Sequence, residues 1–359
     1  MKIVLYIDIM KNGGAQRVMS ILANYLVREK YNVVLVNDGK LESGTAEYEL
    51  DNEIKRLYLL ENFKGNPILK NLKRMVILRK ILKDEKPDIV LSFLGNCNIR
   101  MLISAVGIKC RKIVSVRNDP NREYGTSCIK KILTRFIFRL ADGVVFQTEA
   151  AKEYFPKSVQ EKSTIIINPV RKEFFCGVRK EKKQIISLGR LSSQKNHRLL
   201  IDAYGEICKD IEDDLYIYGE GPLREELERY IKKKGLETRV FLPGRTRDVY
   251  EVLARARIFV LSSDYEGMPN ALLEALAAGV PCISTDCPCG GPRMVITNEK
   301  NGLIVGCNDI VSMKNALLRM EQNDSFRKQL GDAARKEAVM FATDKILKEW
   351  EMYLVQGVC

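Results

Sequence analysis

Two glutamates, Glu266 and Glu274, stand eight positions apart in a segment that follows an apolar run and leads into a helical pattern. Gly267 and Pro269 do not fit inside a regular helix, so Glu266 must lie on the loop between strand and helix. Proline is favoured at the first helical position, which predicts a helix start near Pro269 and places Glu274 about a turn and a half inside. Ionised carboxylates accept hydrogen bonds from hydroxyl groups, so this pair could hold a polyhydroxylated ligand.

A second group of residues could bind phosphate. Arg190 and Lys195 follow another strand-like run and precede the next helical pattern. An arginine fork with a lysine five residues later, beside a helix N-terminus, suits a diphosphate. The alternative is a solvated pair of cations on an exposed loop. His197, the one histidine of the chain, is expected to orient this loop or stack near the phosphates rather than act as a base.

Glycines end two other predicted strands. Gly13 and Gly14 precede a helical pattern, where backbone N–H groups could approach an anion at a helix N-terminus, although a simple tight turn is equally compatible. Gly219 and Gly221 lack the third glycine of a dinucleotide fingerprint, and Arg224 stands near its expected place. We interpret that turn as one that lets a ligand pass close by.

Apolar, β-branched runs alternate with amphipathic stretches along the chain, a pattern typical of parallel sheets covered by helices. A helix is predicted over 15–26, where apolar residues recur at helical spacing. Predicted strands lie near 2–8, 33–37, 89–93, 112–117, 143–148 and 163–168, then near 184–189, 214–218, 239–242, 257–261, 281–285 and 303–305. The fold class is therefore α/β, and the second half repeats the architecture of the first.

The length of 359 residues predicts two domains, because single hydrophobic cores stop growing below that size. A charged segment without strand signals, 171–183, is the expected hinge. We place an N-terminal domain at 1–176 and a C-terminal domain at 177–342, and expect helix 343–359 to pack back on the first. Open parallel sheets bind ligands beyond the carboxyl ends of their strands, which predicts a site in a cleft between the domains.

Several kinds of site are absent from the sequence. Nothing matches the P-loop pattern, and a single histidine excludes a multi-histidine metal centre. Ten cysteines show no Cys-x-x-Cys spacing, which favours reduced thiols over zinc or disulfides. No Asp-x-Asp pair is available to hold a divalent metal. We expect no metal and no cofactor, so that side-chain cations and helix dipoles must neutralise a leaving diphosphate.

These motifs, in this order, resemble glycosyltransferase family 4, whose members are retaining enzymes of the GT-B fold with two Rossmann-like domains. The resemblance rests on Gly13 and Gly14, on the segments 189–191 and 195–196, on the 219–222 turn and on the two glutamates, and it spans essentially the whole chain. The chain is most similar to the hexosaminyltransferases that build polysaccharides and lipid-linked oligosaccharides. The turn 285–292 is similar to one that recurs in such enzymes.

The resemblance implies a role for each motif. Arg190 and Lys195 would hold the donor diphosphate, and Glu266 would contact the transferred hexose; these three would be the catalytic residues. Glu274 would bind the ribose hydroxyls. Reaction would proceed by attack on the front face, with the leaving diphosphate taking the proton of the acceptor. Other donor contacts are implied for Gly13 and Gly14, reaching from the opposite domain, and for Gly221, Gly267, Met268, Pro269 and Asn270.

One departure from the family pattern concerns the first domain. Many relatives carry a histidine near the end of the fourth strand, where this chain reads Val114-Ser115-Val116-Arg117-Asn118-Asp119. We therefore interpret Arg117 and Asn118 as acceptor or sugar contacts.

The net charge of the chain indicates what kind of partner it binds. A formal net charge of +13 calls for an anionic partner, and the basic amphipathic segments 69–83 and 129–136 both fall in the first domain. Such helices can lie on an anionic bilayer, each basic residue contributing about 1 kcal/mol, although an ordinary helix with a core face is equally compatible. The first residues read as a strand and no apolar run reaches ~18 residues. We expect a cytoplasmic protein, peripheral at the inner face of the plasma membrane.

The leading hypothesis is transfer of a hexose or N-acetylhexosamine from a UDP-sugar to an undecaprenyl-diphosphate-linked saccharide, in assembly of a capsule or another cell-surface polysaccharide. A second hypothesis keeps the fold and changes the acceptor to a soluble molecule. A third, from another class, is a basic nucleic-acid-binding protein. No aromatic residues interleave with the basic ones on a single face, so we expect no nucleic acid partner.

Overall fold

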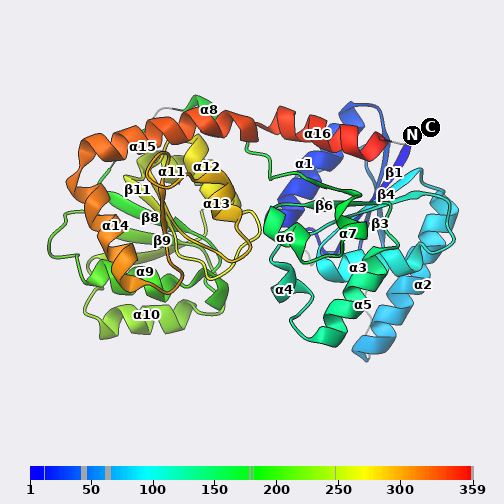
Figure 1. Ribbon diagram of the computed structural model, residues 1–359, viewed down its shortest axis with the longest axis horizontal. Coiled ribbons are helices and arrows are strands. Elements are labelled where there is room, and N and C mark those ends of the chain that lie inside the picture. Colours follow the sequence, from blue (N-terminus) through cyan, green and yellow to red (C-terminus); the bar gives the residue numbers. More distant parts are fainter. Residues whose placement is uncertain are drawn as a thin grey trace. The chain divides into compact units, whose positions relative to one another are not determined.

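The computed structural model describes residues 1–11, 13–41, 47–60, 66–177, 179–180, 182–246 and 248–356. The chain divides into two compact units, Met1–Ile167 with Ile346–Cys359, and Asn168–Lys345. Each unit is a parallel sheet covered by helices (Figure 1). The α/β class with two Rossmann-like halves is therefore confirmed.

The first unit contains a seven-stranded sheet in the order β3-β2-β1-β4-β5-β6-β7. Its strands are β1 (Lys2–Ile7), β2 (Asn32–Asn37), β3 (Lys55–Tyr58), β4 (Ile89–Phe93), β5 (Arg111–Ser115), β6 (Gly143–Phe146) and β7 (Ser163–Ile165). Its helices are α1 (Gly14–Arg28), α2 (Pro67–Glu85), α3 (Gly95–Ser104), α4 (Pro120–Glu123), α5 (Cys128–Phe138), α6 (Glu149–Glu153), α7 (Lys157–Gln160) and most of α16 (Thr343–Val355).

Helices of the first unit pack on both faces of the sheet. Alternate residues of β1, beginning with Ile3, share one core with α1 and with Trp350 of α16. Helix α3 packs against α2 and α5, and the three lie together on the other side of the sheet from α1 (Figure 1). The last helix of the chain thus completes the core of the first unit.

The second unit contains a six-stranded sheet in the order β10-β9-β8-β11-β12-β13. Its strands are β8 (Gln184–Leu188), β9 (Asp214–Tyr218), β10 (Val240–Gly244), β11 (Ile258–Leu261), β12 (Cys282–Thr285) and β13 (Leu303–Val305). Its helical segments are α8 (Glu173–Cys176), η1 (Ser193–Lys195), α9 (His197–Gly205), α10 (Arg224–Lys233), α11 (Val249–Arg255), α12 (Asn270–Ala277), α13 (Gly291–Val295), α14 (Ile310–Gln322), α15 (Asp324–Glu337) and η2 (Ala338–Phe341).

One strand was not predicted. β3 lies at the edge of the first sheet, pairs only with β2, and begins with two basic residues, Lys55 and Arg56. A short, charged edge strand carries no apolar run, so periodicity cannot detect it. Two predicted strands also end early, because β7 stops at Ile165 and β6 at Phe146.

The segment expected to be the hinge, 171–183, belongs to the second unit. Phe174 of α8 is fully buried there, and Arg335 donates hydrogen bonds to the carbonyls of Phe175 at 2.6 Å and Gly177 at 3.1 Å. Residues 178 and 181 of this segment lie outside the described part of the chain. In the described part, no helix has both the length and the apolar character needed to cross a bilayer.

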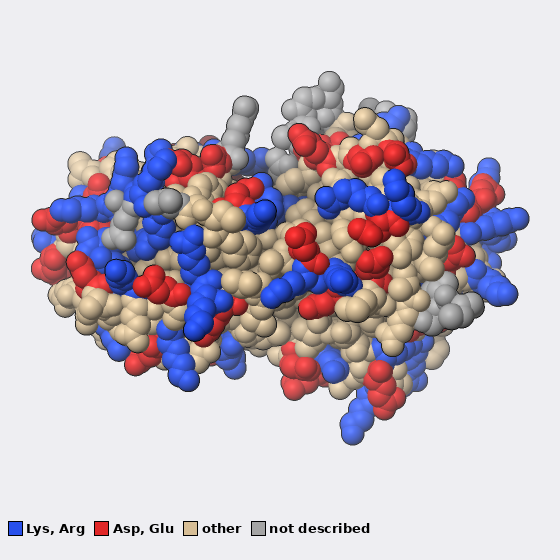
Figure 2. Space-filling model, turned by 90° about the horizontal axis from the view of Figure 1, so that it is seen from above, with Lys and Arg blue, Asp and Glu red and all other residues tan. Residues whose placement is uncertain are grey.

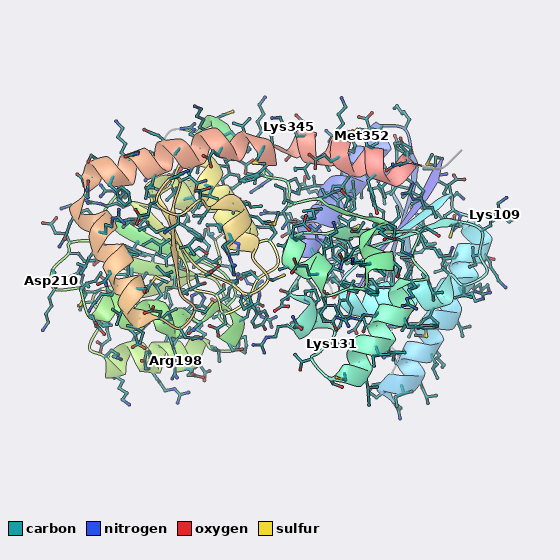
Figure 3. The ribbon with its side chains drawn as sticks, in the orientation of Figure 1. Lys109, Lys131, Arg198, Asp210, Lys345 and Met352 are labelled. Carbon is teal, nitrogen blue, oxygen red and sulfur yellow. The ribbon has the colours of Figure 1, made fainter. Side chains whose placement is uncertain are left out.

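The packing of α16 generates a stability prediction. Trp350 is fully buried, and its ring centroid lies 5.5 Å from that of Phe93. Trp350→Ala should therefore lower the free energy of unfolding of the first unit by about 3 to 5 kcal/mol. Met352 on the exposed side of the same helix (Figure 3) provides the control, Met352→Ala. Urea titration followed by circular dichroism measures both, and equal effects of the two variants would contradict the role of Trp350.

Candidate functional site

The carboxyl ends of β8, β9, β11 and β12 lie at one edge of the second sheet, because these neighbouring strands are parallel. Arg190 and Lys195 follow β8, and Glu266 follows β11. The structure therefore places the predicted phosphate-binding and sugar-binding residues on adjacent loops at this edge.

Lys195 and Glu266 form an ion pair at this edge. The ammonium of Lys195 lies 2.6 Å from Glu266 Oε1, and the hydroxyl of Ser263 donates to the same oxygen at 2.8 Å. Glu266 Oε2 makes no hydrogen bond to any described residue. One oxygen of the carboxylate is thus fixed, while the other can accept from a ligand.

Hydrogen bonds tie the loop that carries the cations to the loop that carries Glu266. Gln194 Nε2 donates to the carbonyl of Tyr265 at 2.9 Å, and the hydroxyl of Ser262 donates to the carbonyl of Lys195 at 2.9 Å. Asn196 Nδ2 donates to Asp264 at 2.7 Å. These hydrogen bonds hold the two loops together, so they help the ion pair to fix the distance between Lys195 and Glu266.

Ser263 was missed by the sequence analysis, yet it connects the loop after β11 to the end of β12 and the loop that follows it. Besides its contact with Glu266, its carbonyl accepts from the hydroxyl of Thr285 at 2.5 Å and from the thiol of Cys287 at 3.3 Å. Ser263 is fully buried. A serine on a polar loop has no spacing signal, so only the structure identifies it.

Arg190 differs from Lys195 in its surroundings. Its side chain is exposed, and its guanidinium makes no ion pair or hydrogen bond with the described residues. Because burial does not restrict it and no carboxylate neutralises it, this guanidinium is available to an anion at the carboxyl edge.

The glycines after β9 have a packing role. Gly219 has φ of +146°, and a Cβ there would stand 1.8 Å from the carbonyl oxygen of Gly189. A Cβ on Gly221 would stand 2.2 Å from the carbonyl oxygen of Leu191. These glycines let the turn lie against the backbone on both sides of Arg190. A donor contact by Gly221 stays a prediction.

Helix α12 begins at Asn270, with Pro269 as its N-cap, as the position of the proline predicted. Glu274 is 2% exposed and lies within the helix among buried apolar residues. The segment from Gly267 to Pro269 is buried and Asn270 is half-buried. The Met268 carbonyl accepts from Asn168 Nδ2 at 2.9 Å.

His197 is buried at the start of α9 and does not reach the surface of the loop. Neither ring nitrogen makes a hydrogen bond of normal geometry with the described residues, although an interaction with the backbone of Arg190 favours the charged ring. Burial, aided by the positive charge of Lys195, lowers the pKa of His197 to about 4. The imidazole is therefore neutral near pH 7, and a role in orienting the loop or stacking near the phosphates stays a prediction.

The first unit carries the remaining predicted residues. Gly13 is the N-cap of α1 and Gly14 its first residue, while Asn12 lies outside the described part. Asn118 is half-buried after β5. Arg117 is buried over the Phe93 ring, 4.7 Å from its centroid.

The surroundings of Arg117 include a carboxylate that the sequence analysis missed. Burial lowers the pKa of Arg117 to about 9, opposed by the charge of Glu123. Glu123 Oε1 accepts from the backbone N–H of Gly95 at 2.6 Å, at the start of α3. Burial raises the pKa of Glu123 to about 7. Arg117 and Glu123 thus belong to a buried polar cluster, and a ligand contact by Arg117 or Asn118 stays a prediction.

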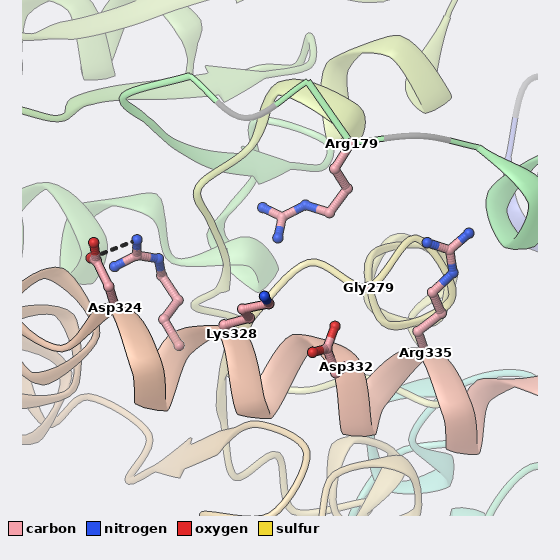
Figure 4. Close-up of a pocket in the computed structure, with 7 residues that line it drawn as sticks. Arg179, Gly279, Asp324, Lys328, Asp332 and Arg335 are labelled. Atoms are coloured by element: carbon pink, nitrogen blue, oxygen red, sulfur yellow. Dashed lines mark ion pairs between the residues drawn. The ribbon is translucent and has the colours of Figure 1, made fainter.

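A separate cavity of about 350 Å³ lies along α15 (Figure 4). Its lining includes Arg179, Lys328, Asp332 and Arg335, and Gly279 places it near the start of β12, away from the carboxyl edge. No predicted site residue lines this cavity. Two of its arginines donate hydrogen bonds to backbone carbonyls. Arg335 donates to Phe175 and Gly177, and Arg179 donates to Ala256. These contacts indicate that the arginines fix the segment before β8 in place.

The chain is similar to known proteins in sequence and in fold. Residues 12–174 match the family model described as Glycosyltransferase Family 4, and residues 171–337 match the one described as Glycosyl transferases group 1. A Campylobacter jejuni protein is 29% identical over 98% of this chain and 97% of its own. It is named GalNAc-alpha-(1->4)-GalNAc-alpha-(1->3)-diNAcBac-PP-undecaprenol alpha-1,4-N-acetyl-D-galactosaminyltransferase.

An Escherichia coli protein named UDP-Gal:alpha-D-GlcNAc-diphosphoundecaprenol alpha-1,3-galactosyltransferase is 28% identical over 86% of this chain and 84% of its own. The solved structure of HepE from Anabaena, in complex with UDP and glucose, shares the fold with a TM-score of 0.82. It is 16% identical over 99% of this chain and 100% of that chain. Because the two glycosyltransferase models overlap at 171–174 and together span residues 12–337, this protein is a glycosyltransferase and belongs to family 4.

Proposed function

We propose that this glycosyltransferase moves a hexose or N-acetylhexosamine from a UDP-sugar to an undecaprenyl-diphosphate-linked saccharide, with retention at the anomeric carbon. One observation carries the proposal, the exposed Arg190 beside the Lys195 and Glu266 pair at the carboxyl edge of the second sheet. The names of the Campylobacter jejuni and Escherichia coli relatives support this class of donor and acceptor.

The reaction exchanges one bond at the anomeric carbon for another. The bond from this carbon to the diphosphate oxygen breaks, and a bond to the acceptor oxygen forms on the same face. The proton of the acceptor hydroxyl passes to the leaving diphosphate oxygen. Negative charge develops on the diphosphate as the first bond breaks, so cations placed there beforehand lower the barrier.

Arg190 and Lys195 stabilise the leaving diphosphate in different ways, because their surroundings differ. Arg190 is exposed and can bind the diphosphate with two parallel hydrogen bonds. Lys195 is held 2.6 Å from Glu266 Oε1 and keeps two further N–H donors for the phosphate nearer the sugar. Glu266 Oε2 accepts from a hydroxyl of the transferred sugar. The ion pair therefore sets the spacing between the sugar and the diphosphate.

The other predicted contacts complete the proposal. Glu274 binds the ribose hydroxyls, and the backbone from Gly267 to Asn270 lines the sugar and phosphate. Gly13 and Gly14 contribute donor contacts, and Arg117 and Asn118 act on the acceptor side. Protein cations alone neutralise the leaving group, so we propose that no metal ion takes part.

We also propose that the enzyme works at the inner face of the plasma membrane. The net charge of +13 supports an anionic surface as partner. Acidic and basic side chains are interspersed on the face shown in Figure 2. In contrast, α5 contains no acidic residue, and those of α2 lie at its last two positions, Asp84 and Glu85.

The ribose contact can be tested by binding. Glu274→Gln keeps the size of the side chain and removes its charge, so UDP should bind roughly 10-fold to 100-fold more weakly, because a hydrogen bond to a charged group is lost. Calorimetric titration of UDP measures this. Glu225→Gln, at an exposed position of α10, should bind as the parent does. Unchanged affinity of a folded Glu274→Gln protein would refute the assignment.

The diphosphate contact can be tested by turnover. In a screen of labelled UDP-sugars, Arg190→Ala should lower kcat about 100-fold or more, since stabilisation of the developing charge is lost. Arg198→Ala, at an exposed arginine on α9 (Figure 3), is the matched control and should retain activity. Addition of EDTA should leave UDP release unchanged. Loss of turnover with EDTA would overturn the metal-free proposal, and no turnover with any donor would count against the function.

Membrane association can be tested by flotation. The protein should float with vesicles that contain phosphatidylglycerol and remain behind with neutral phosphatidylcholine, because the attraction is to negative charge. Binding should weaken as salt rises. Indifference to both lipid charge and salt would contradict an anionic membrane as the partner.

A further inference from the structure

Helix α5 carries apolar residues on two sides, and the described part of the chain covers one of them. Thr134, Ile137 and Phe138 are buried against the unit. On the other side lie Ile129, Ile132, Leu133 and Phe136, whose exposed fractions are 78%, 66%, 57% and 63%. Their spacing of i, i+3, i+4 and i+7 places all four on one stripe of the helix.

The first half of α2 repeats this feature. Its large exposed residues are Ile68, Leu69, Leu72 and Val76, whereas its buried residues, Leu78 and Leu82, lie in the second half. Both helices pack against α3, and in the ribbon they run close together on the same side of the sheet (Figure 1). The two outward stripes therefore belong to one surface of the first unit, which we call the α2/α5 surface.

Basic side chains border the stripe on α5. Lys130 and Arg139 are exposed on either side of it, whereas Lys131 and Arg135 lie nearer the covered side, half-buried beside the ring of Tyr154 at 5.5 Å and 5.4 Å from its centroid. Lys131 is labelled in Figure 3. An apolar centre with a cationic border matches the chemistry of an anionic bilayer, in which hydrocarbon lies beneath negative headgroups. Two copies of this chain would bring like charges together, which disfavours self-association through this surface.

We propose that the α2/α5 surface inserts its apolar residues below the headgroups of an anionic bilayer, so that the protein is held by hydrocarbon contact as well as by charge. This inference rests on the proposed membrane location and adds the mode of binding. The sequence left open whether these helices lie on a bilayer or use their apolar face in the core; here α5 has apolar residues both in the core and on the exposed side. Attraction to headgroups brings the surface to the bilayer, and the stripe then resists removal by salt.

Insertion has a direct spectroscopic test. The chain has one tryptophan, Trp350, which is fully buried, so Phe136→Trp adds a reporter on the stripe with little background. With vesicles of phosphatidylglycerol and phosphatidylethanolamine, its emission should shift to the blue and be quenched by lipids brominated on their acyl chains. The control reporter is Val311→Trp, at an exposed position of α14, which should show neither effect.

Paired variants separate insertion from attraction. The double variant Ile132→Ser with Phe136→Ser should lose at least tenfold in vesicle partitioning at high salt, where charge is screened. The double variant Lys130→Gln with Arg139→Gln should lose binding mainly at low salt. Val311→Ser with Met340→Ser removes exposed apolar residues from the second unit and should bind as the parent does.

The outcomes distinguish this inference from the proposals on which it rests. Flotation without a blue shift or quenching would overturn insertion and leave surface adsorption. Neither flotation nor a shift would overturn the membrane location as well. Turnover measured with an acceptor in detergent tests glycosyl transfer separately. Formation of dimers that the Ile132→Ser and Phe136→Ser double variant abolishes, without vesicle binding, would assign the surface to a second copy of the chain instead.

Discussion

A single carboxylate oxygen, Glu266 Oε1, connects the loops on which the candidate site depends. It accepts from the ammonium of Lys195 at 2.6 Å and from the hydroxyl of Ser263 at 2.8 Å. Since Glu266 is 7% exposed, removal of either partner would leave a carboxylate with little water to replace it. The ion pair with Glu266, on the loop after β11, therefore fixes the position of the Lys195 ammonium without help from a ligand.

Burial also sets the environment of two other polar groups near the site. His197 is held neutral in the core, and Glu274 lies within α12 among apolar neighbours. Arg190 is the contrasting case, exposed and without a partner in the described residues. The sheet edge therefore presents one guanidinium that a ligand can reach without displacing a contact, next to a lysine that is already positioned.

The sequence predicted much of this architecture, for physical reasons. Parallel strands that are covered by helices carry short apolar runs, and β4, β9 and β13 lie at their predicted positions. Pro269 placed the start of α12 because proline fits only the beginning of a helix. The Ser263 contacts could not be foreseen, since they depend on loop conformations that bring residues from different strands together. The exposed apolar stripe of α5 could not be predicted from the sequence either. Periodicity shows that a helix has an apolar face, but it does not show whether other parts of the protein cover that face.

The position of α16 has a consequence for how the protein is made. The core of the first unit includes Ile346, Leu347, Trp350 and Leu354, which follow the whole second unit in the chain. During synthesis on the ribosome, the second unit is therefore complete before the first has all of its core. Until residue 354 emerges, the Phe93 ring of β4, against which Trp350 packs, stays uncovered on that side, so the order in which the two halves mature is the reverse of their order in the sequence.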